Sequence, residues 1–541
     1  MPTNVALPSV VDAVVIGGGP NGLVSAALLA DSGLSVLLLE SASQLGGAVK
    51  STESEGWTTD RFSSSYPLVS ASPIMKGLEL EAHGLKWARA DIALAHPLDR
   101  HDPDGAIIHR DRTVTAANLA EESPRDGAAW LQLCEEYDRI SSAFLDAMLT
   151  AWPPVAATRR LRKLVGGTAE MMRFARFLAL PTVRMGQELF EGRRGRALLA
   201  GNAMHADAPP VAPISGLMGW LMAMLAQDVG FPVPVGGAGR LSAALAARAE
   251  RAGADLRTGE PVVEISTSAG RANGVRTASG HTVLANRAVV ADVSALNLYR
   301  ELLHRTDLPA GLNRDLDNFE WDFPTVKVNY RLSATPDWTA RQARSAGVVH
   351  AGADANAIVH WAADLETRQI PRTPFALIGQ TTSVDSTRSP IGTQAMWAYT
   401  HLPRGTTDDA AAHQLATRLD EMIESYAPGF GDLIIDREVQ TPSSLHAQDA
   451  NLGSGAINGG TSQLFQQLVF RPVTGLGGPR TPLDGLYLGS AAIHPGGGVH
   501  GGCGALAARA VLSDQRWLGA ARRRATHHVL DRFYRDGSAG P

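Results

Sequence analysis

The chain has little cysteine, few charges and no long apolar run. Its two cysteines, Cys134 and Cys503, exclude a disulfide-stapled scaffold and a cysteine-rich metal site. They also suit a reducing cytoplasm, and the first residues lack the charged and apolar regions of a signal peptide. No apolar stretch reaches the ~18 residues that a membrane-spanning helix needs. We therefore expect a cytoplasmic protein without a transmembrane helix.

The charge balance also narrows the class of partner. Charged residues make up 19% of the chain, and the formal net charge is −5. Nucleic-acid-binding proteins usually carry a basic field, so we expect no nucleic-acid partner. Hydrophobic residues make up 44%, which is enough for a large core, and the length predicts more than one domain. Glycine, by contrast, is abundant, with 55 residues, and several of them gather in short segments.

The first glycine segment lies between a predicted strand and a predicted helix. Residues 11–16 (VDAVVI) predict a buried parallel strand, residues 23–33 a helix, and residues 34–39 a second strand. In this setting glycines allow a tight turn and a close approach of the backbone to a pyrophosphate at the helix N-terminus. The order of elements therefore predicts a dinucleotide site. The turn contains G-x-G-x-x-G, and its residues are Gly17, Gly19, Pro20, Asn21 and Gly22.

The second strand ends at an acidic residue, Glu40. Its carboxylate can accept hydrogen bonds from the hydroxyls of an adenosine ribose. Gly46 and Gly47 follow, and this spacing resembles the extended fingerprint of FAD-binding flavoproteins, whereas NAD domains do not usually carry such a pair there. The amine-oxidase branch of these flavoproteins has arginine directly after the pair. This chain has Ala48 at that position, and Lys50 is the nearest cation.

Another glycine segment lies near the C-terminus. Residues 484–514 predict a short strand, a glycine-rich loop and the start of a helix. Gly496, Gly498 and Gly501 repeat the G-x-G-x-x-G spacing, but no second strand and acid follow. We therefore predict that this loop approaches the same ligand instead of forming a second dinucleotide site. In a flavoprotein, its amides and the helix N-terminus would favour negative charge on the reduced ring.

Four segments together resemble one family, the phytoene-desaturase-like FAD-dependent oxidoreductases. Within it they look like the phytoene-dehydrogenase-related branch that includes pyridine nucleotide-disulfide oxidoreductase domain protein 2. The resemblance implies FAD as the cofactor and an α/β fold. It implies a discontinuous Rossmann-type FAD domain of the glutathione-reductase kind and an α+β substrate domain with a mixed or antiparallel sheet. The segments are residues 12–40 with Gly46-Gly47, 236–265, 451–472 and 485–512.

The same resemblance implies domain boundaries and further contacts with the cofactor. Val262 would contact the adenine through its backbone, and Gly489, with Ser490 beside it, would lie by the pyrophosphate or ribityl chain. The loop that carries Gly498, Val499 and His500 would face the isoalloxazine ring. The FAD domain would comprise residues 1–75, 232–300 and 478–520, the substrate domain residues 76–231 and 301–477, and a C-terminal tail residues 521–541.

Three residues are candidates for acid–base catalysis. His494 and His500 qualify because the ordinary pKa of histidine, ~6.5, suits proton transfer; the alternative is that they only fix the glycine-rich turn. Lys327 lies in a predicted strand, residues 325–332, that is similar to the amine-oxidase strand whose lysine holds a water near flavin N5. It could activate oxygen or relay a proton, and the alternative is an exposed lysine on a strand.

Three further segments carry weaker signals. His96, Asp99, His101 and Asp102 are typical of metal ligands, but the surrounding Pro, Gly and Asp favour a solvated loop, and we expect no metal. Residues 155–196 interleave arginines with apolar residues, so they form either a helix on an anionic membrane surface or a plain surface helix of the substrate domain. Residues 217–225 (LMGWLMAML) form either a core helix or the wall of an apolar substrate tunnel.

The sequence leaves three functions open. The first is a desaturase or dehydrogenase that forms a C=C or C=N bond in a largely apolar small molecule by hydride transfer to flavin N5. Since no second Rossmann unit is visible, oxygen, a quinone or another diffusible acceptor would reoxidise the flavin. The second is an amine-oxidase-like flavin oxidase or an isomerase that needs reduced FAD. The third is a non-catalytic flavin-binding interaction protein. The sequence favours no oligomeric state.

Overall fold

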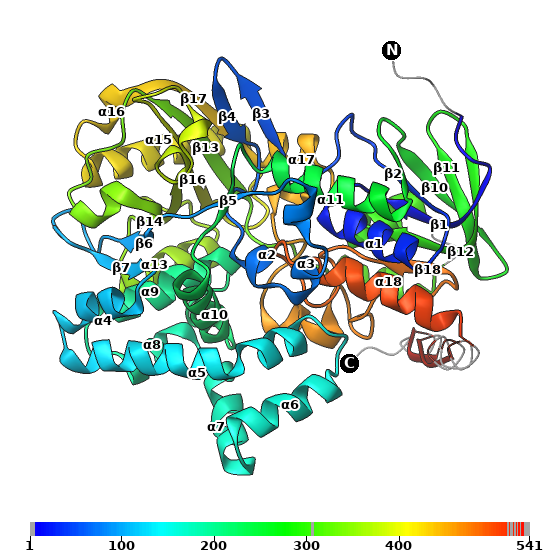
Figure 1. Ribbon diagram of the computed structural model, residues 1–541, viewed down its shortest axis with the longest axis horizontal. Helices are drawn as coiled ribbons and strands as arrows, with labels where there is room; N and C mark the ends of the chain where they lie inside the picture. The colour runs from blue at the N-terminus through cyan, green and yellow to red at the C-terminus, as the bar shows by residue number, and fades with distance from the viewer. Residues whose placement is uncertain are drawn as a thin grey trace.

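The computed structural model describes residues 6–304, 308–516, 519, 523, 526, 528–530 and 532–534. Two α/β parts lie side by side, each around its own sheet, and a group of helices lies below one of them (Figure 1). Most of the predicted C-terminal tail, residues 521–541, lies outside the described residues. None of the described helices is long and apolar enough to cross a membrane.

The first sheet contains the strands predicted at the N-terminus. In the described residues it has seven strands in the order β10-β11-β12-β1-β2-β9, and β18 also pairs with β12. β1 is parallel to β2 and β12, and β12 is parallel to β18. Every strand falls within the three segments that the sequence assigns to the FAD domain. The strands are β1 (Val10–Ile16), β2 (Val36–Leu39), β9 (Asp255–Arg257), β10 (Val262–Ser268), β11 (Arg271–Thr277), β12 (Thr282–Ala291) and β18 (Leu486–Leu488).

Helices cover both faces of this parallel core, which explains why its strands are apolar without alternation. On one face α1 (Pro20–Asp31) lies between α11 (Gly239–Ala252) and α18 (Gly502–Asp514) (Figure 1). Small and branched residues of these helices pack on Val15 and Leu38. The segment that contains α12 (Ala310–Asp317) covers the other face.

The second sheet forms the other α/β part. Within the described ranges it has seven strands in the order β17-β13-β16-β15-β14-β6-β7. Only the β14–β6 pair is parallel, so the sheet is mixed, as the family resemblance implies. α13 (Ala355–Glu366) and α15 (Asp409–Tyr426) pack on it. The strands are β6 (Ile92–His96), β7 (Ala106–His109), β13 (Thr325–Leu332), β14 (Ala346–Ala351), β15 (Ala376–Gln380), β16 (Gln394–His401) and β17 (Ile434–Gln440).

The helical group lies between β7 and β8 in the chain. α5, α7 and α10 pack together through aromatic rings, with Phe144 and Phe177 both edge-on to Trp220. α6 and α7 project from the lower edge of the molecule (Figure 1). The elements are α4 (Arg112–Ala120), α5 (Pro124–Met148), α6 (Val155–Val165), α7 (Thr168–Ala179), α8 (Thr182–Leu189), α9 (Arg193–Ala203) and α10 (Ser215–Asp228).

Shorter elements complete the two parts. The hairpin of β3 and β4 lies between the two α/β parts, and β4 contacts β16 of the second sheet (Figure 1). These elements are β3 (Ser51–Ser54), β4 (Trp57–Asp60), α2 (Pro67–Ala71), α3 (Pro73–Lys76), β5 (Trp87–Ala88), β8 (Val233–Pro234), α14 (Thr381–Val384), α16 (Phe430–Leu433) and α17 (Pro442–Gln448).

The expectation of a solvated loop at His96 is wrong for the histidine itself. Residues 97–105 form a turn between β6 and β7, but His96 ends the apolar strand β6 and is fully buried. Its Nε2 lies 2.8 Å from the carbonyl oxygen of Ala353, and burial lowers its pKa to about 4. In the described part of the chain, no three His, Cys, Asp or Glu side chains gather as metal ligands would.

A glycine sets the spacing of α1 and α18. A Cβ at Gly504 would lie 2.1 Å from the carbonyl oxygen of Asn21. We predict that Gly504→Ala pushes the two helices apart and destabilises the fold by about 1–3 kcal/mol, measured by denaturant unfolding. Gly478→Ala is the control, because no atom lies within 4 Å of its added Cβ. Equal losses in the two variants would contradict this account of the packing.

Candidate active site

A cavity of about 390 Å³ lies at the carboxyl ends of β1 and β12 and extends to the second sheet. In parallel sheets this edge is where ligands bind, because strand ends and helix N-termini converge there. The first sheet contributes the turn after β1 and Asp292 after β12. The second contributes Lys327 of β13 with Trp397 and Tyr399 of β16, and α10 closes the far end. The cavity therefore joins the predicted dinucleotide turn to the predicted substrate domain.

Many of the predicted cofactor contacts meet in this cavity. Those in its wall are Gly19, Pro20, Asn21, Gly47, Ala48, Ser490, Gly498, Val499 and His500. Those outside the wall are Gly17, Gly22, Glu40, Gly46, Val262 and Gly489.

Glu40 and Val262 lie beside the dinucleotide turn. The carboxylate of Glu40 accepts a hydrogen bond of 2.7 Å from the amide of Gly18. The amide of Glu260 donates to the carbonyl oxygen of Glu40, which brings the start of β10 next to the acid. Gly489 packs instead between strand and helix, since a Cβ there would lie 3.1 Å from Val290 and 3.2 Å from Ala507.

The wall of the cavity has the close backbone approaches that a flavin dinucleotide requires. A Cβ at Gly19 would lie 2.8 Å from a carboxylate oxygen of Asp292, and one at Gly47 would lie 3.1 Å from the Cα of Gly19. At the opposite end, a Cβ at Gly497 would lie 2.8 Å from Oδ1 of Asn458. Only glycine lets these parts of the wall pack so closely, which leaves bare main chain along the cavity for a dinucleotide to approach. The residues present therefore fit FAD.

The two candidate histidines occupy different positions. His500 lines the cavity, and the amide of Gly502 donates to its Nδ1 at 2.9 Å. Burial lowers the pKa of His500 to about 4, so its Nε2 carries the proton; that nitrogen makes no hydrogen bond within the described residues. This nitrogen is itself buried, next to the main chain of Gly496 and Gly497, although the residue lines the cavity. His494 lies outside the wall, with Nε2 3.2 Å from the carbonyl oxygen of Thr150, a position that favours the turn-fixing alternative.

Lys327 is buried, so the alternative of an exposed strand lysine is wrong. Its side chain is in the cavity wall and the residue is only 4% exposed. Nζ donates to the carbonyl oxygen of Asp60 and to Oδ1 of Asn329, each at 2.6 Å. Burial lowers the pKa of Lys327 to about 7, although the carboxylate of Asp60 acts to raise it. A large share of this amine is therefore neutral at physiological pH.

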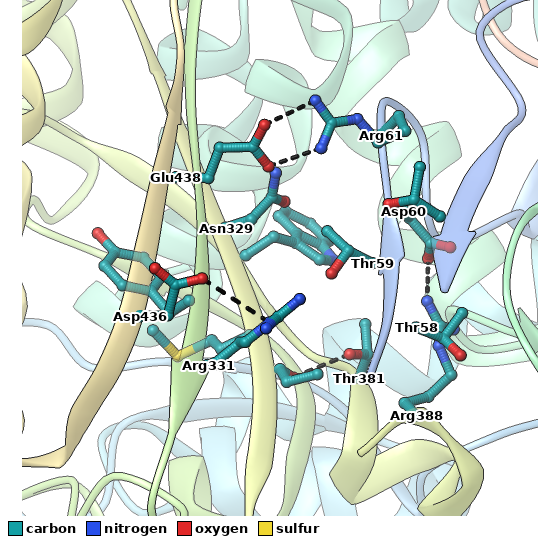
Figure 2. A pocket seen from close by; sticks show the side chains of 15 residues that line it. Thr58, Thr59, Asp60, Arg61, Asn329, Arg331, Thr381, Arg388, Asp436 and Glu438 are labelled. Atoms are coloured by element: carbon teal, nitrogen blue, oxygen red, sulfur yellow. Dashed lines mark hydrogen bonds and ion pairs between the residues drawn. The ribbon is translucent and has the colours of Figure 1, made fainter. Parts of the chain in front are cut away.

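A polar pocket of about 100 Å³ lies between the β3–β4 hairpin and β13, and its lining includes Asp60 and Asn329, which accept hydrogen bonds from Lys327 (Figure 2). On one side Asp60 forms a fully buried ion pair of 2.5 Å with Arg388. On the other, Arg61 contacts both carboxylate oxygens of Glu438. Asp60 also accepts hydrogen bonds from Ser51, Ser64 and the amide of Ala238. This network fixes the main chain that holds Lys327.

The far end of the cavity is apolar. The run predicted as either a core helix or a tunnel wall is both, because it forms α10. Trp220 and Leu225 are buried in the helical core, whereas Met218, Leu221 and Met222 face the cavity. Hydrophobic side chains with few polar groups suit a largely apolar ligand.

The sequence did not predict several residues of the cavity wall. Asp292 directly follows β12, and its carboxylate accepts a hydrogen bond of 2.7 Å from the amide of Gly22. A strand next to β1 that ends in an acid is a signal that could have indicated it. His205 and the stacked pair Trp397 and Tyr399 carry no comparable local signal, because folding alone brings them to the cavity.

A dinucleotide site formed by glycine-rich turns and an adjoining apolar cavity are together typical of a flavin-dependent oxidoreductase. The chain belongs to the family of flavin-containing amine oxidoreductases, whose family model matches residues 21–512. The chain is an FAD-dependent oxidoreductase, in agreement with the resemblance noted in its sequence.

The chain matches several known proteins over nearly the whole length of both sequences. The chain is 29% identical to pyridine nucleotide-disulfide oxidoreductase domain-containing protein 2 of Mus musculus, over 93% of each chain. It is 23% identical to a limonene dehydrogenase subunit of Castellaniella defragrans, over 93% of this chain and 94% of that one. The structure of cyclohexylamine oxidase from Brevibacterium oxydans covers 93% of this chain and 99% of its own, with a TM-score of 0.53 at 15% identity. This last likeness shows the fold.

The acid beside the dinucleotide turn makes FAD binding depend on pH. Burial raises the pKa of Asp292 to about 7, and Asp449 and Glu40 add to the effect; Lys50 acts on Asp449 in the opposite sense. The phosphates of FAD add negative charge, so binding favours protonated Asp292. We predict that the FAD dissociation constant rises above pH ~7, by up to ~10-fold per pH unit, in fluorescence titrations.

Two variants test the assignment of this pH dependence. Asp292→Asn removes the titrating group, so its affinity for FAD should stay nearly constant between pH 6 and pH 8.5. Asp12→Asn, whose side chain lies on the other end of β1, should keep the wild-type dependence. A wild-type dependence in Asp292→Asn would contradict the assignment.

Proposed function

We propose that this enzyme is a dehydrogenase or desaturase that forms a C=C bond in a largely apolar small molecule. The observation that carries the proposal is the single cavity that joins the flavin cradle to α10, with Lys327 in its wall. We also assign the FAD domain to residues 1–75, 232–300 and 478–520, and the substrate domain to residues 76–231 and 301–477. The limonene dehydrogenase relative, which matches over nearly the full length, supports an apolar substrate.

The chain's own residues bind and orient the substrate. When bound, FAD supplies a hydride acceptor, and oxygen, a quinone or another diffusible acceptor then takes the electrons. Met218, Leu221 and Met222 would hold the apolar body, and methionine adapts to irregular shapes. His500 would border the cofactor beside the glycine-rich loop. Burial of the site excludes water from the reacting carbon.

Lys327 would take the proton that leaves when a hydride is removed. Formation of a double bond releases one hydride and one proton, and the neutral amine at Nζ can accept the proton. A separate polar pocket is lined by Asp60 and Asn329, the two residues that accept hydrogen bonds from Nζ of Lys327. Water in that pocket would carry the proton away from Lys327, and the apolar wall of the cavity would bind the substrate.

Lys327→Met removes this base. We predict that anaerobic flavin reduction by substrate, or the reoxidation step, slows by ~10²–10⁴-fold in stopped-flow measurements. The wild-type rate should rise with pH through about 7, since deprotonation creates the base, and the variant should lose this rise. Lys86→Met, at an exposed position, is the control. An unchanged rate in Lys327→Met would refute the role.

A second candidate function is amine oxidation. Trp397 and Tyr399 stack with ring centroids 6.0 Å apart in the cavity wall, and aromatic faces attract cationic amines. The rings stack on each other, however, which leaves no gap between them for a substrate. We therefore rank this function, a reduced-FAD-dependent isomerase and a non-catalytic flavin protein below dehydrogenation.

We further propose that the α6–α7 hairpin rests on an anionic membrane surface. Trp152, Val155 and Met172 are exposed by 46%, 53% and 70%, next to exposed Arg159 and Lys163. α7 also packs on α10, which forms the apolar wall of the cavity. A lipid surface there would supply an apolar substrate close to its binding site.

Vesicle sedimentation tests the membrane contact. The protein should sediment with phosphatidylglycerol vesicles at low salt and less so at high salt, because salt screens the attraction. The double variant Arg159→Glu and Lys163→Glu should lose most binding. Matched reversals at exposed positions elsewhere, Arg251→Glu and Arg372→Glu, should not. Equal binding by both double variants would contradict the proposal.

A further inference from the structure

A buried cation lies directly behind the cavity wall. Arg471 is fully buried, and within the described part of the chain its guanidinium donates to main-chain carbonyl oxygens alone. Nε donates to Ala491 at 2.9 Å, Nη2 to Asn458 at 2.7 Å and Nη1 to Thr461 at 3.0 Å. Ala491 and Asn458 are themselves in the cavity wall. The arginine therefore ties together two separate segments of that wall.

The glycine-rich loop packs on the same guanidinium. A Cβ at Gly496 would lie 3.2 Å from its Cζ and Nε. The next residues of that loop, Gly497 and Gly498, line the cavity. The loop that packs on the charge of Arg471 therefore also lines this part of the cavity. Because the arginine is fully buried, its charge acts on the cavity with less screening than a charge in water.

No carboxylate among the described residues forms an ion pair with Arg471. The acid nearest in the network, Asp322, lies on the other side of the same segment and accepts from the amides of Ile457 and Asn458 at 2.9 Å each. Burial and the neighbouring Asp207 raise the pKa of Asp322 to about 6. Asp207 in turn is paired with His401, 2.9 Å away. Burial lowers the pKa of Arg471 to about 10, although Asp322 acts through space to raise it, and within the described structure its charge lacks a contacting carboxylate.

A buried charge without a partner is costly, so the site gains when a negative charge arrives. Reduction of a flavin by a hydride adds two electrons and one proton, which leaves one net negative charge to be stabilised. The negative charge that would balance Arg471 is therefore present only when the cofactor is reduced. The main-chain cage also lets Arg471 act on the cavity without a side-chain partner that could neutralise it.

We propose that Arg471 raises the reduction potential of the bound flavin by placing an uncompensated positive charge behind the glycine-rich loop. This proposal deepens the proposed function and rests on it in one respect: the bound flavin must cycle between its oxidised and reduced states. Arg471 acts here as a positioning and electrostatic residue, since it contacts the wall and not the substrate. Its effect is independent of which molecule supplies the hydride.

The midpoint potential of bound FAD tests the proposal without any substrate. It is measured by anaerobic photoreduction against reference dyes. Arg471→Gln keeps part of the hydrogen bonding and removes the charge. The midpoint potential of FAD bound to this variant should fall by at least about 30 mV, which is a tenfold change in the equilibrium constant of a two-electron couple. Arg471→Lys keeps the charge and loses most of the cage, and its potential should stay near the wild-type value. Arg480→Gln, whose arginine pairs with Asp514, is the control.

The two variants distinguish the effect of the positive charge of Arg471 from the effect of its hydrogen bonds to the main chain. If Arg471→Gln and Arg471→Lys shift the potential equally, the cage matters and the charge does not, which overturns the proposal. If Arg471→Gln cannot retain FAD, Arg471→Lys decides alone, and a potential as low as that of free FAD overturns the proposal. Failure of the dehydrogenase assignment would leave these potentials unchanged, because no substrate enters the measurement.

Discussion

The site depends on the carboxylate of Asp60. It accepts from the amide at the start of α11, pairs with buried Arg388, and the same residue's carbonyl oxygen holds Lys327. Each partner comes from a different element, so one acid ties the FAD-binding sheet, the β3–β4 hairpin and the second sheet into one unit. A buried pair of this kind is stable only when both charges stay together, and loss of either partner leaves an uncompensated charge. Asp60, fixed by this ion pair, holds Nζ of Lys327 in the wall through its carbonyl oxygen, and burial there lowers the pKa of the lysine.

Local sequence was sufficient to predict the first sheet and the dinucleotide turn. β1, α1 and β2 lie where the apolar runs and glycines indicate, because burial on both faces and the tight turn leave few alternatives. The strand predicted around Lys327 also coincides with β13, Thr325–Leu332. Nine of the predicted cofactor contacts lie in one cavity wall, because motifs far apart in the chain meet at the carboxyl edge of a parallel sheet. The FAD assignment agrees with the family match.

Features set by tertiary packing could not be predicted. The burial of Lys327 depends on the hairpin that folds over β13, and the role of Arg471 depends on carbonyl groups from two distant segments. His96 lies in a stretch of polar and turn-forming residues, yet the apolar strand before it carries it into the core. His494 belongs to the predicted motif, but its ring contacts Thr150 at the end of the helical group. In each case the partner is remote in sequence, so composition and spacing held no information about it.

We propose that the apolar wall of the cavity determines which class of molecule the flavin oxidises. Anaerobic mixing of the FAD-loaded protein with apolar isoprenoid hydrocarbons and, separately, with primary amines of matched carbon skeleton tests it most directly. The loss of the flavin's visible absorption band reports reduction. We expect that at least one hydrocarbon reduces the flavin and that the matched amine does not. Reduction by amines alone, or by neither class, would contradict the claim.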